Sequence, residues 1–355
     1  MGKSKKALFI ENTILNIFML LVLFGLYGCG DSHGEQVSAV EARALQHTAF
    51  LSETIGKRPA GSENEAKGRD YIAGEFQRLG YDVTIQPFSF ERNGVTMESA
   101  NVIAKLRGRS NSEMIVGGHY DSVPETAGTG ASDNAAAIGV ILALARDLGS
   151  SLLPYTVKFV AFGTEETGQQ GSEYYVSQMT ADEISQTVGM INLDTLIGGD
   201  KIYVYGTEGP GGWIRDQALF IASAQGIPLE TNPGWNPAYP VGTTGDWSDH
   251  ASFKRIGISY AYFEATNWEI GDLDGYKQTV KHGEIWHTDK DTIAFIETEF
   301  PGRIAFQLKS FITVLRELLL HLDPPAQSSG PLNILRSEKK ATIIRKTTRD
   351  GKYIF

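Results

Sequence analysis

The chain has 355 residues, 41% of them hydrophobic and 21% charged, a composition that suits one large globular domain or two small ones. Its net charge of −10 at pH 7 repels polyanions, so we expect no nucleic-acid partner. The single cysteine, Cys29, excludes an internal disulfide.

The first 29 residues have the layout of an export signal. Lysines near the start precede an apolar stretch over residues 14–27, which is shorter than a typical membrane span. The segment Leu26-Tyr27-Gly28-Cys29 resembles a bacterial lipoprotein processing box, which implies lipid attachment at Cys29. We therefore expect an exported protein anchored by lipid to the extracytoplasmic side of a membrane, in the periplasm or at the cell surface. An ordinary cleaved signal and an uncleaved anchor are the alternatives.

The rest of the chain divides into a short polar tether (30–37), one domain (38–323), and a linker with a basic tail (324–355). Alternating apolar residues around Asp350-Gly351 predict a hairpin in the tail, either docked on the domain or binding something outside it. Hydrophobic periodicity predicts helices over residues 37–55, 62–79, 134–148, 172–178, 212–225 and 297–322. Strands are expected over residues 82–90, 101–106, 113–117, 155–162, 188–193, 201–205 and 257–263. This alternation predicts an α/β fold with a mostly parallel sheet covered on both faces.

Polar residues that could hold metal follow several of the expected strands. His119 and Asp121 end one strand, Glu165-Glu166 follow another, and Asp194 follows a third. Asp133 stands before an apolar helix, where it could also be only an N-cap, and His287 lies in a later loop. The carboxyl ends of parallel strands share one edge of the sheet, so these residues are expected to converge there.

The donor set suits zinc because it combines two imidazoles with three carboxylates. If Asp133 bridges two ions, one ion receives His119 and Asp194 and the other receives Glu166 and His287. Each ion then has three protein ligands and room for a shared water. We therefore expect two Zn²⁺ per chain.

Two further carboxylates have predicted catalytic roles. Glu165 adjoins a ligand but points elsewhere, so it is placed to take a proton from water and deliver it to a leaving amine. Asp121 is expected to accept the second ring N–H of His119 and fix its tautomer.

Five short segments together resemble the aminopeptidase Y and glutamate carboxypeptidase-like family of co-catalytic zinc exopeptidases. They are His119-Tyr120-Asp121-Ser122, Ser132-Asp133-Asn134, Glu165-Glu166, Asn192-Leu193-Asp194 and His287-Thr288. The resemblance covers roughly residues 37–322. It implies a three-layer α/β/α sandwich around a mixed sheet, two zinc ions, the ligand and base roles given above, and a peptide or protein substrate with a free N-terminus.

Within the family, segments at 192–201, 231–234, 264–268 and 274–276 look closest to a bacterial subgroup that trims basic residues from exported proteins. The loops before His287 are acidic, and Asp249 and Glu264 are the residues we expect to bind substrate there. Together these features predict a preference for a cationic first residue. The alternative is an acidic loop that is merely solvated.

Three other functions remain open. A carboxypeptidase of the same fold would need cations for a C-terminal carboxylate, for which Arg215 and Arg255 are the candidates. A glutaminyl cyclase uses a similar scaffold with one zinc ion. A non-catalytic binding module is the third possibility, although all five ligand positions and the base are present here.

Overall fold

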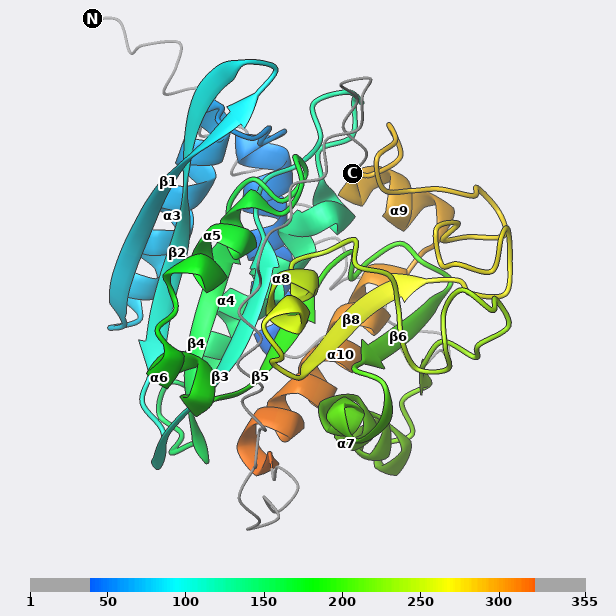
Figure 1. Ribbon diagram of the computed structural model, residues 1–355. Coiled ribbons are helices and arrows are strands. Elements are labelled where there is room, and N and C mark those ends of the chain that lie inside the picture. Colours follow the sequence, from blue (N-terminus) through cyan, green and yellow to red (C-terminus); the bar gives the residue numbers. More distant parts are fainter. Residues whose placement is uncertain (1–38, 323–355) are drawn as a thin grey trace, which may run out of the picture.

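The structure is a computed structural model that describes residues 39–322 (Figure 1). The predicted signal, the lipid site at Cys29, the tether and the basic tail lie outside the described residues. Within residues 39–322, no helix combines the length and the apolar character needed to cross a membrane.

The described residues form one eight-stranded sheet in the order β1-β2-β4-β3-β5-β8-β6-β7. Its strands are β1 (Asp82–Arg92), β2 (Val95–Leu106), β3 (Ser110–His119), β4 (Tyr155–Phe162), β5 (Thr187–Leu193), β6 (Lys201–Gly206), β7 (Leu229–Glu230) and β8 (Tyr260–Thr266). The four central strands, β4, β3, β5 and β8, run parallel to one another. Antiparallel pairs join β1 to β2, β2 to β4 and β6 to β8, so the predicted mixed sheet is confirmed.

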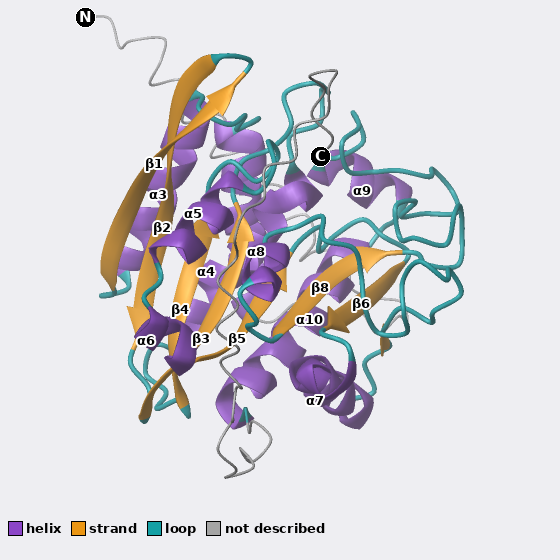
Figure 2. Ribbon diagram, in the orientation of Figure 1, coloured by secondary structure: helices purple, strands orange, loops and turns teal. Residues whose placement is uncertain are grey.

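Helices cover both faces of this sheet (Figure 2). They are α2 (Ala39–Ala49), α3 (Glu63–Arg78), α4 (Ala136–Leu148), α5 (Gln170–Gln178), α6 (Ala181–Gln186), α7 (Trp213–Ala224), α8 (His250–Arg255), α9 (Ile293–Glu299) and α10 (Arg303–His321). Side chains of α2, α3, α4, α7 and α10 share one apolar cluster, and α5 and α8 contribute to a second. The three-layer α/β/α architecture expected from the sequence is confirmed.

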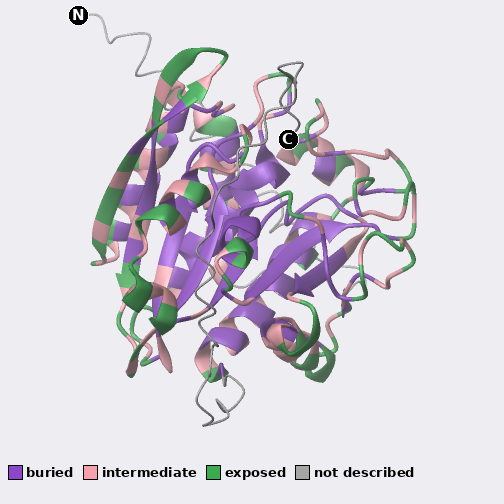
Figure 3. Ribbon diagram, viewed as in Figure 1, coloured by how far each residue is buried: buried purple, intermediate pink, exposed green. Residues whose placement is uncertain are grey.

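Strand alternation explains the two clusters. In β3, Met114 and Val116 enter the cluster with α4, whereas Ile115 enters the opposite one. In β8, Phe263 points to the first cluster and Tyr262 to the second. Because successive side chains leave a strand on opposite faces, a strand covered on both sides must be apolar along its whole length. Strand β3 is accordingly buried over residues 113–119, and β8 is buried over its whole length (Figure 3).

The prediction of a single long helix over residues 297–322 is wrong. The chain forms α9 and then α10, with Pro301 and Gly302 between them. Proline has no N–H to continue a helix, and Gly302 has a φ of 79°, which breaks the helical path. Helix α9 also begins earlier than predicted, because the Thr292 side chain accepts the Phe295 N–H and caps it.

Strand β2 begins earlier than predicted and forms a long hairpin with β1. The turn is Asn93-Gly94, with φ of 53° and 74°, which is the positive-φ pair that tight hairpins need. The Asn-Gly pair is a recognised hairpin signal, so the sequence carried this information. Helices α6 and α8 and strand β7 were also not predicted, because segments this short show too little periodicity.

Two helical glycines test how closely α4 packs on α2. A Cβ on Gly139 of α4 would collide with the carbonyl oxygen of Ala44 and the hydroxyl of Thr48 in α2, whereas a Cβ on Gly74 of α3 would meet nothing within 4 Å. We expect Gly139→Ala to lower the free energy of unfolding by about 1–3 kcal/mol through overpacking. Gly74→Ala, the control, should raise it by about 0.5–1 kcal/mol, since alanine is the better helix former. Urea unfolding of both variants measures this, and equal shifts would contradict the close helix contact.

Candidate metal centre

The predicted site residues lie at one edge of the sheet, where the parallel strands end. His119 is the last residue of β3, Asp194 follows β5 directly, and Glu165-Glu166 follow β4 after two intervening residues. Asp133 lies in the turn before α4, and His287 lies in the loop between β8 and α9. Because β3, β4 and β5 are parallel, their carboxyl ends deliver these side chains to the same place.

The five predicted ligands come together around Asp133. Its Oδ1 lies 3.1 Å from Nε2 of His119, which is also 3.3 Å from Oδ1 of Asp194. Its Oδ2 lies 3.1 Å from Nε2 of His287, which is 2.9 Å from Oε2 of Glu166. Asp133 therefore presents one oxygen to each of two groups of side chains, in the arrangement that a bridging carboxylate requires.

The backbone conformation around Asp133 explains why its carboxylate faces the imidazoles and does not cap helix α4. Asp133 and Asn134 have non-helical backbone angles, and the N-cap of α4 is Ala135. Asp133 is therefore not the cap of this helix, which was the simpler interpretation of the sequence. The Asn134 side chain donates to the carbonyl of Leu193 at 2.9 Å and ties the turn to the end of β5.

Asp121 contacts two of the site's segments. Its Oδ1 lies 3.3 Å from Nδ1 of His119, the ring nitrogen whose N–H Asp121 is predicted to accept. Its two oxygens also accept the backbone N–H groups of Glu165 and Glu166, at 2.9 and 3.1 Å. The sequence did not predict this second contact, which holds the Glu165-Glu166 turn in place.

Glu165 is buried beside the ligand cluster. Burial raises its pKa well above the usual range for a glutamate, and the nearby carboxylates of Asp249 and Glu166 raise it further, while His119 opposes the rise. A buried carboxyl with a perturbed pKa beside a cluster of metal-ligand candidates is a candidate general acid or base.

The pKa values of the ligand candidates are also shifted, because several charged groups lie close together in a buried place. Burial raises the pKa of Glu166 to about 8, and Asp133 adds to the rise. Burial alone would lower the pKa of His287, but Asp133 and Glu166 raise it to about 11. For His119 the lowering effect of burial is likewise outweighed, chiefly by Asp194, so that its pKa stands well above the usual value. Negative charge exceeds positive charge here, so the cluster favours cations.

The donor atoms fit a divalent metal. Among the described residues, the buried oxygens Glu166 Oε1 and Asp194 Oδ1 accept no hydrogen bond. Ligand atoms of His119, Asp133 and Glu166 all lie within 4.8 Å of one another. Carboxylate oxygens with free lone pairs beside imidazole nitrogens are the donor set that zinc binds.

The Oδ2 atom of Asp194 is held by two hydrogen bonds in series, a relay formed by Ser248 and Asn192. Ser248 donates to Asp194 Oδ2 at 2.7 Å, and Asn192 donates to the Ser248 oxygen at 2.8 Å. The relay leaves Oδ1 of Asp194 facing His119. Such partners orient a ligand and stabilise its charge.

The sequence predicted no role for Arg58, which is fully buried next to the site. Its guanidinium donates to backbone carbonyls of Leu51, Gly56, Tyr120, Thr129 and Gly130. Burial lowers its pKa to about 10, and Asp121, Asp291, Asp133 and Glu166 act to raise it. An arginine before a proline in a loop looks like a surface residue, so no signal in a single sequence reveals this role.

The two predicted substrate-binding residues are both buried. Asp249 is 0% exposed, and burial raises its pKa to about 7. Glu264 is 4% exposed and accepts the Tyr205 hydroxyl at 2.9 Å, while Trp268 donates to that hydroxyl oxygen at 2.6 Å. Their role toward substrate stays a prediction.

Part of the acidic loop charge is neutralised within the chain. Asp246 pairs with Lys254 at 2.6 Å, and Glu269 pairs with Lys201 at 2.6 Å. Asp249 and Glu264 are the two carboxylates of this region that lie buried without a cationic partner among the described ion pairs.

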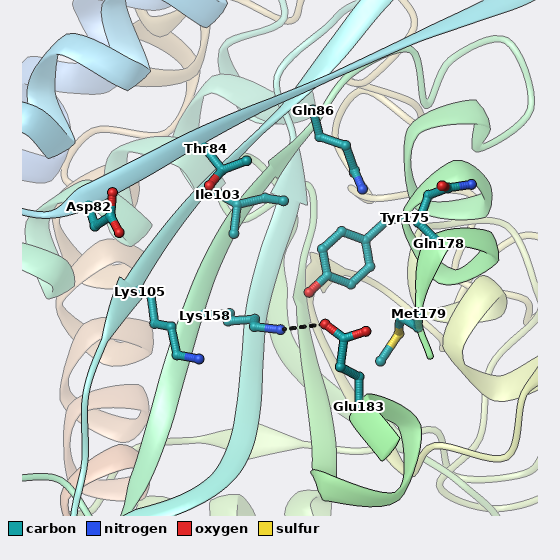
Figure 4. Close-up of a pocket in the computed structure, with 10 residues that line it drawn as sticks. All are labelled: Asp82, Thr84, Gln86, Ile103, Lys105, Lys158, Tyr175, Gln178, Met179 and Glu183. Carbon is teal, nitrogen blue, oxygen red and sulfur yellow. Dashed lines mark ion pairs between the residues drawn. The ribbon is translucent and has the colours of Figure 1, made fainter. Parts of the chain in front are cut away.

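A separate groove lies on the sheet face near α5 and α6 (Figure 4). Its cation Lys158 lies 3.9 Å from Glu183 and 2.6 Å from Glu113, and Lys105 also pairs with Glu113 at 2.7 Å. The residues that line the groove include none of the metal-ligating candidates, so the groove is distinct from the cluster around Asp133.

Sequence comparison gives matches with known proteins. Residues 101–312 match the model of peptidase family M28. The alkaline phosphatase isozyme conversion protein of Escherichia coli K12 is 33% identical over 296 residues, covering 75% of this chain and 86% of that protein. An aminopeptidase of Bacillus subtilis, YwaD, is 30% identical over 186 residues, covering 51% of this chain and 36% of that protein.

Solved structures share the fold. A zinc aminopeptidase from Bacillus subtilis superposes with a TM-score of 0.65 at 19% identity, covering 81% of this chain and 97% of that one. A glutaminyl cyclase from Porphyromonas gingivalis gives a TM-score of 0.60 at 21% identity, covering 79% and 99%. The fold by itself thus does not separate the two activities.

The family expected from the sequence is confirmed, and the resemblance to the bacterial subgroup is supported by the match to the alkaline phosphatase isozyme conversion protein. With the family model spanning most of the sheet and the site segments up to His287, the chain belongs to peptidase family M28.

Proposed function

We propose that this peptidase is a two-zinc aminopeptidase that acts outside the cytoplasm on peptides or proteins with a free N-terminus. The observation that carries the proposal is the Asp133 carboxylate, which faces His119 with one oxygen and His287 with the other. A family membership that includes aminopeptidase relatives supports the reaction.

The chain's residues would divide the work as follows. His119, Asp133 and Asp194 would hold one ion, and Asp133, Glu166 and His287 the other. Zinc, when bound, supplies Lewis acidity that polarises the scissile carbonyl and acidifies water. Glu165 would take the proton from the attacking water and pass it to the nitrogen of the leaving amine. His287, with 37% of its side chain exposed, marks the side open to substrate.

The proposed location rests on the amino-terminal sequence. The lysine-rich start, the apolar stretch and the Cys29 segment support export and lipid anchoring to a membrane. The acidic domain then works outside the cytoplasm on peptides or proteins that reach it.

A cationic first residue is the proposed side-chain preference. Glu264 supplies a buried carboxylate that accepts the Tyr205 hydroxyl, and the ring of Trp268 packs against that of Tyr205. Aromatic faces and a carboxylate both attract ammonium and guanidinium groups. A carboxypeptidase is less well supported, because Arg215 pairs with Asp216 and Arg255 pairs with Glu173, both at 2.8 Å.

Replacing Glu165 tests the proposed base. Glu165→Gln keeps the shape of the side chain but cannot accept the proton, so we expect kcat to fall by about 10²–10⁴-fold with zinc content unchanged. Glu173→Gln, at an exposed glutamate outside the cluster, is the control and should behave as wild type. Near wild-type turnover in Glu165→Gln would rule this residue out as the base.

Metal removal tests the proposed ions. A chelator should abolish hydrolysis of N-terminal amides, and added zinc should restore it with two ions per chain. Because zinc would bind the folded chain and relieve repulsion among its carboxylates, saturation at about 1,000 times Kd should stabilise the protein by about 4 kcal/mol per site. Thermal unfolding and metal analysis measure both effects. One ion per chain, with cyclisation of N-terminal glutamine instead of hydrolysis, would favour the glutaminyl cyclase alternative.

A substrate panel tests the proposed preference. We expect arginine and lysine amides to be cleaved with higher kcat/KM than leucine amide. Glu264→Gln should lower the arginine-to-leucine ratio by roughly tenfold, since a buried charge pair would be lost. The control is Glu269→Gln, at a glutamate already paired with Lys201. A clear preference of the wild type for leucine would refute the idea.

A further inference from the structure

Asp291 lies buried behind the metal cluster, in the same loop as His287. Its Oδ1 accepts the backbone N–H of Ser132 at 2.6 Å, and its Oδ2 accepts that of Asp133 at 3.1 Å. One carboxylate thus accepts hydrogen bonds from two successive amides of the turn that carries Asp133, the ligand candidate at the centre of the cluster.

The same residue is tied to its own loop and to the chain before the Asp133 turn. Its N–H donates to the carbonyl of Thr288 at 3.2 Å, and its carbonyl accepts the N–H of Thr129 at 2.9 Å. Asp291 therefore joins the His287 loop to the Asp133 turn through both its side chain and its backbone.

The two amides need an acceptor of this kind. They lie before the first residue of α4, Ala136, and the non-helical backbone at Asp133 removes them from helical hydrogen bonding. Leaving buried N–H groups unpaired would cost about 1–3 kcal/mol each. An ionised carboxylate makes stronger hydrogen bonds to them than a neutral acceptor does.

Two other turns of the site are held in the same way. Asp121 accepts the successive amides of Glu165 and Glu166. Gln278 Oε1 accepts those of Ile285 and Trp286, directly before His287, at 2.9 and 2.8 Å. Asp291 differs from Gln278 because it connects the segments of two ligands, as Asp121 does for His119 and Glu166.

We propose that Asp291 is a positioning residue that sets the placement of the Asp133 carboxylate relative to His287, and thereby the affinity of the ion shared by Asp133, Glu166 and His287. A rotation of the Ser132–Asp133 backbone would carry the carboxylate away from His287. The ion on the His119 side depends less on this link, because Asp194 has its own relay through Ser248. The inference rests on the proposed two-zinc function.

The test is Asp291→Asn, studied by calorimetric zinc titration of the metal-free full chain and by the absorption spectrum of the cobalt-substituted protein. Asparagine keeps one acceptor oxygen but turns an NH₂ group toward the second amide. We expect one ion to bind as in wild type and the other to bind about 10–100-fold more weakly, the usual effect of losing such a partner. At limiting zinc kcat should fall while KM changes little, and excess zinc should restore kcat.

Asp289→Asn is the matched control, because Asp289 lies in the same loop at the exposed surface, where its side chain accepts the N–H of Ala127 and no N–H of a ligand-bearing segment within residues 39–322. It should leave both affinities and the cobalt spectrum unchanged. Circular dichroism of the metal-free variants checks the fold, and Asp291→Ser takes the place of Asp291→Asn if the latter does not fold.

The outcomes separate the two proposals. Two ions with wild-type affinity and an unaltered cobalt spectrum in Asp291→Asn would overturn the positioning role while leaving the two-zinc function intact. A wild-type chain that binds fewer than two ions would overturn the proposed function, and the inference with it.

Discussion

Crowding of carboxylates at one buried sheet edge is the constraint on which this site depends. The four carboxylates that contact the two imidazoles are Asp121, Asp133, Glu166 and Asp194. Glu165 and Asp249 are buried beside them, and burial raises the pKa of both. Desolvated like charges are costly unless cations or hydrogen-bond donors offset them. The cationic partners that the described chain places here are the two imidazoles and the guanidinium of Arg58, which makes the site receptive to further positive charge.

Backbone amides offset much of the remaining charge. Asp121 and Asp291 each accept two successive N–H groups, so every such pair both stabilises an anion and fixes a turn. Arg58 does the complementary work by donating to carbonyls of the neighbouring loops. The same hydrogen bonds therefore determine both the charge balance of the site and the conformation of its loops. A substitution that removes one of these bonds alters both.

The sheet carries the candidate metal site and the proposed substrate-binding glutamate on different strands. The parallel strands β3, β4 and β5 deliver the ligand and base candidates, because their carboxyl ends meet at one edge. Strand β8 and the antiparallel β6 instead carry Glu264 and its Tyr205 partner. The residues of the proposed substrate preference and the metal-binding candidates therefore lie on different strands of one sheet.

Much of the fold and the candidate ligands could be predicted from the sequence because both depend on local patterns. The strand over residues 155–162 and the helix over 62–79 are visible in the order of apolar residues, and His119, Glu166 and Asp194 follow such strands directly. The convergence of the five ligand candidates also followed, since parallel strands end at one edge. The family resemblance rested on these same short segments.

Only the tertiary structure decided how that site is held. The contact of Asp291 with the Ser132 amide joins positions 159 residues apart, and that of Arg58 with Gly130 joins positions 72 apart. Neither partner shows a distinctive pattern in its own segment, because a backbone amide or carbonyl is present at nearly every position. The tertiary structure also buries Asp249, whereas an acidic loop in the sequence suggests a residue at the surface. Side-chain type determined which residues could bind metal, whereas long-range packing determined which polar groups support them.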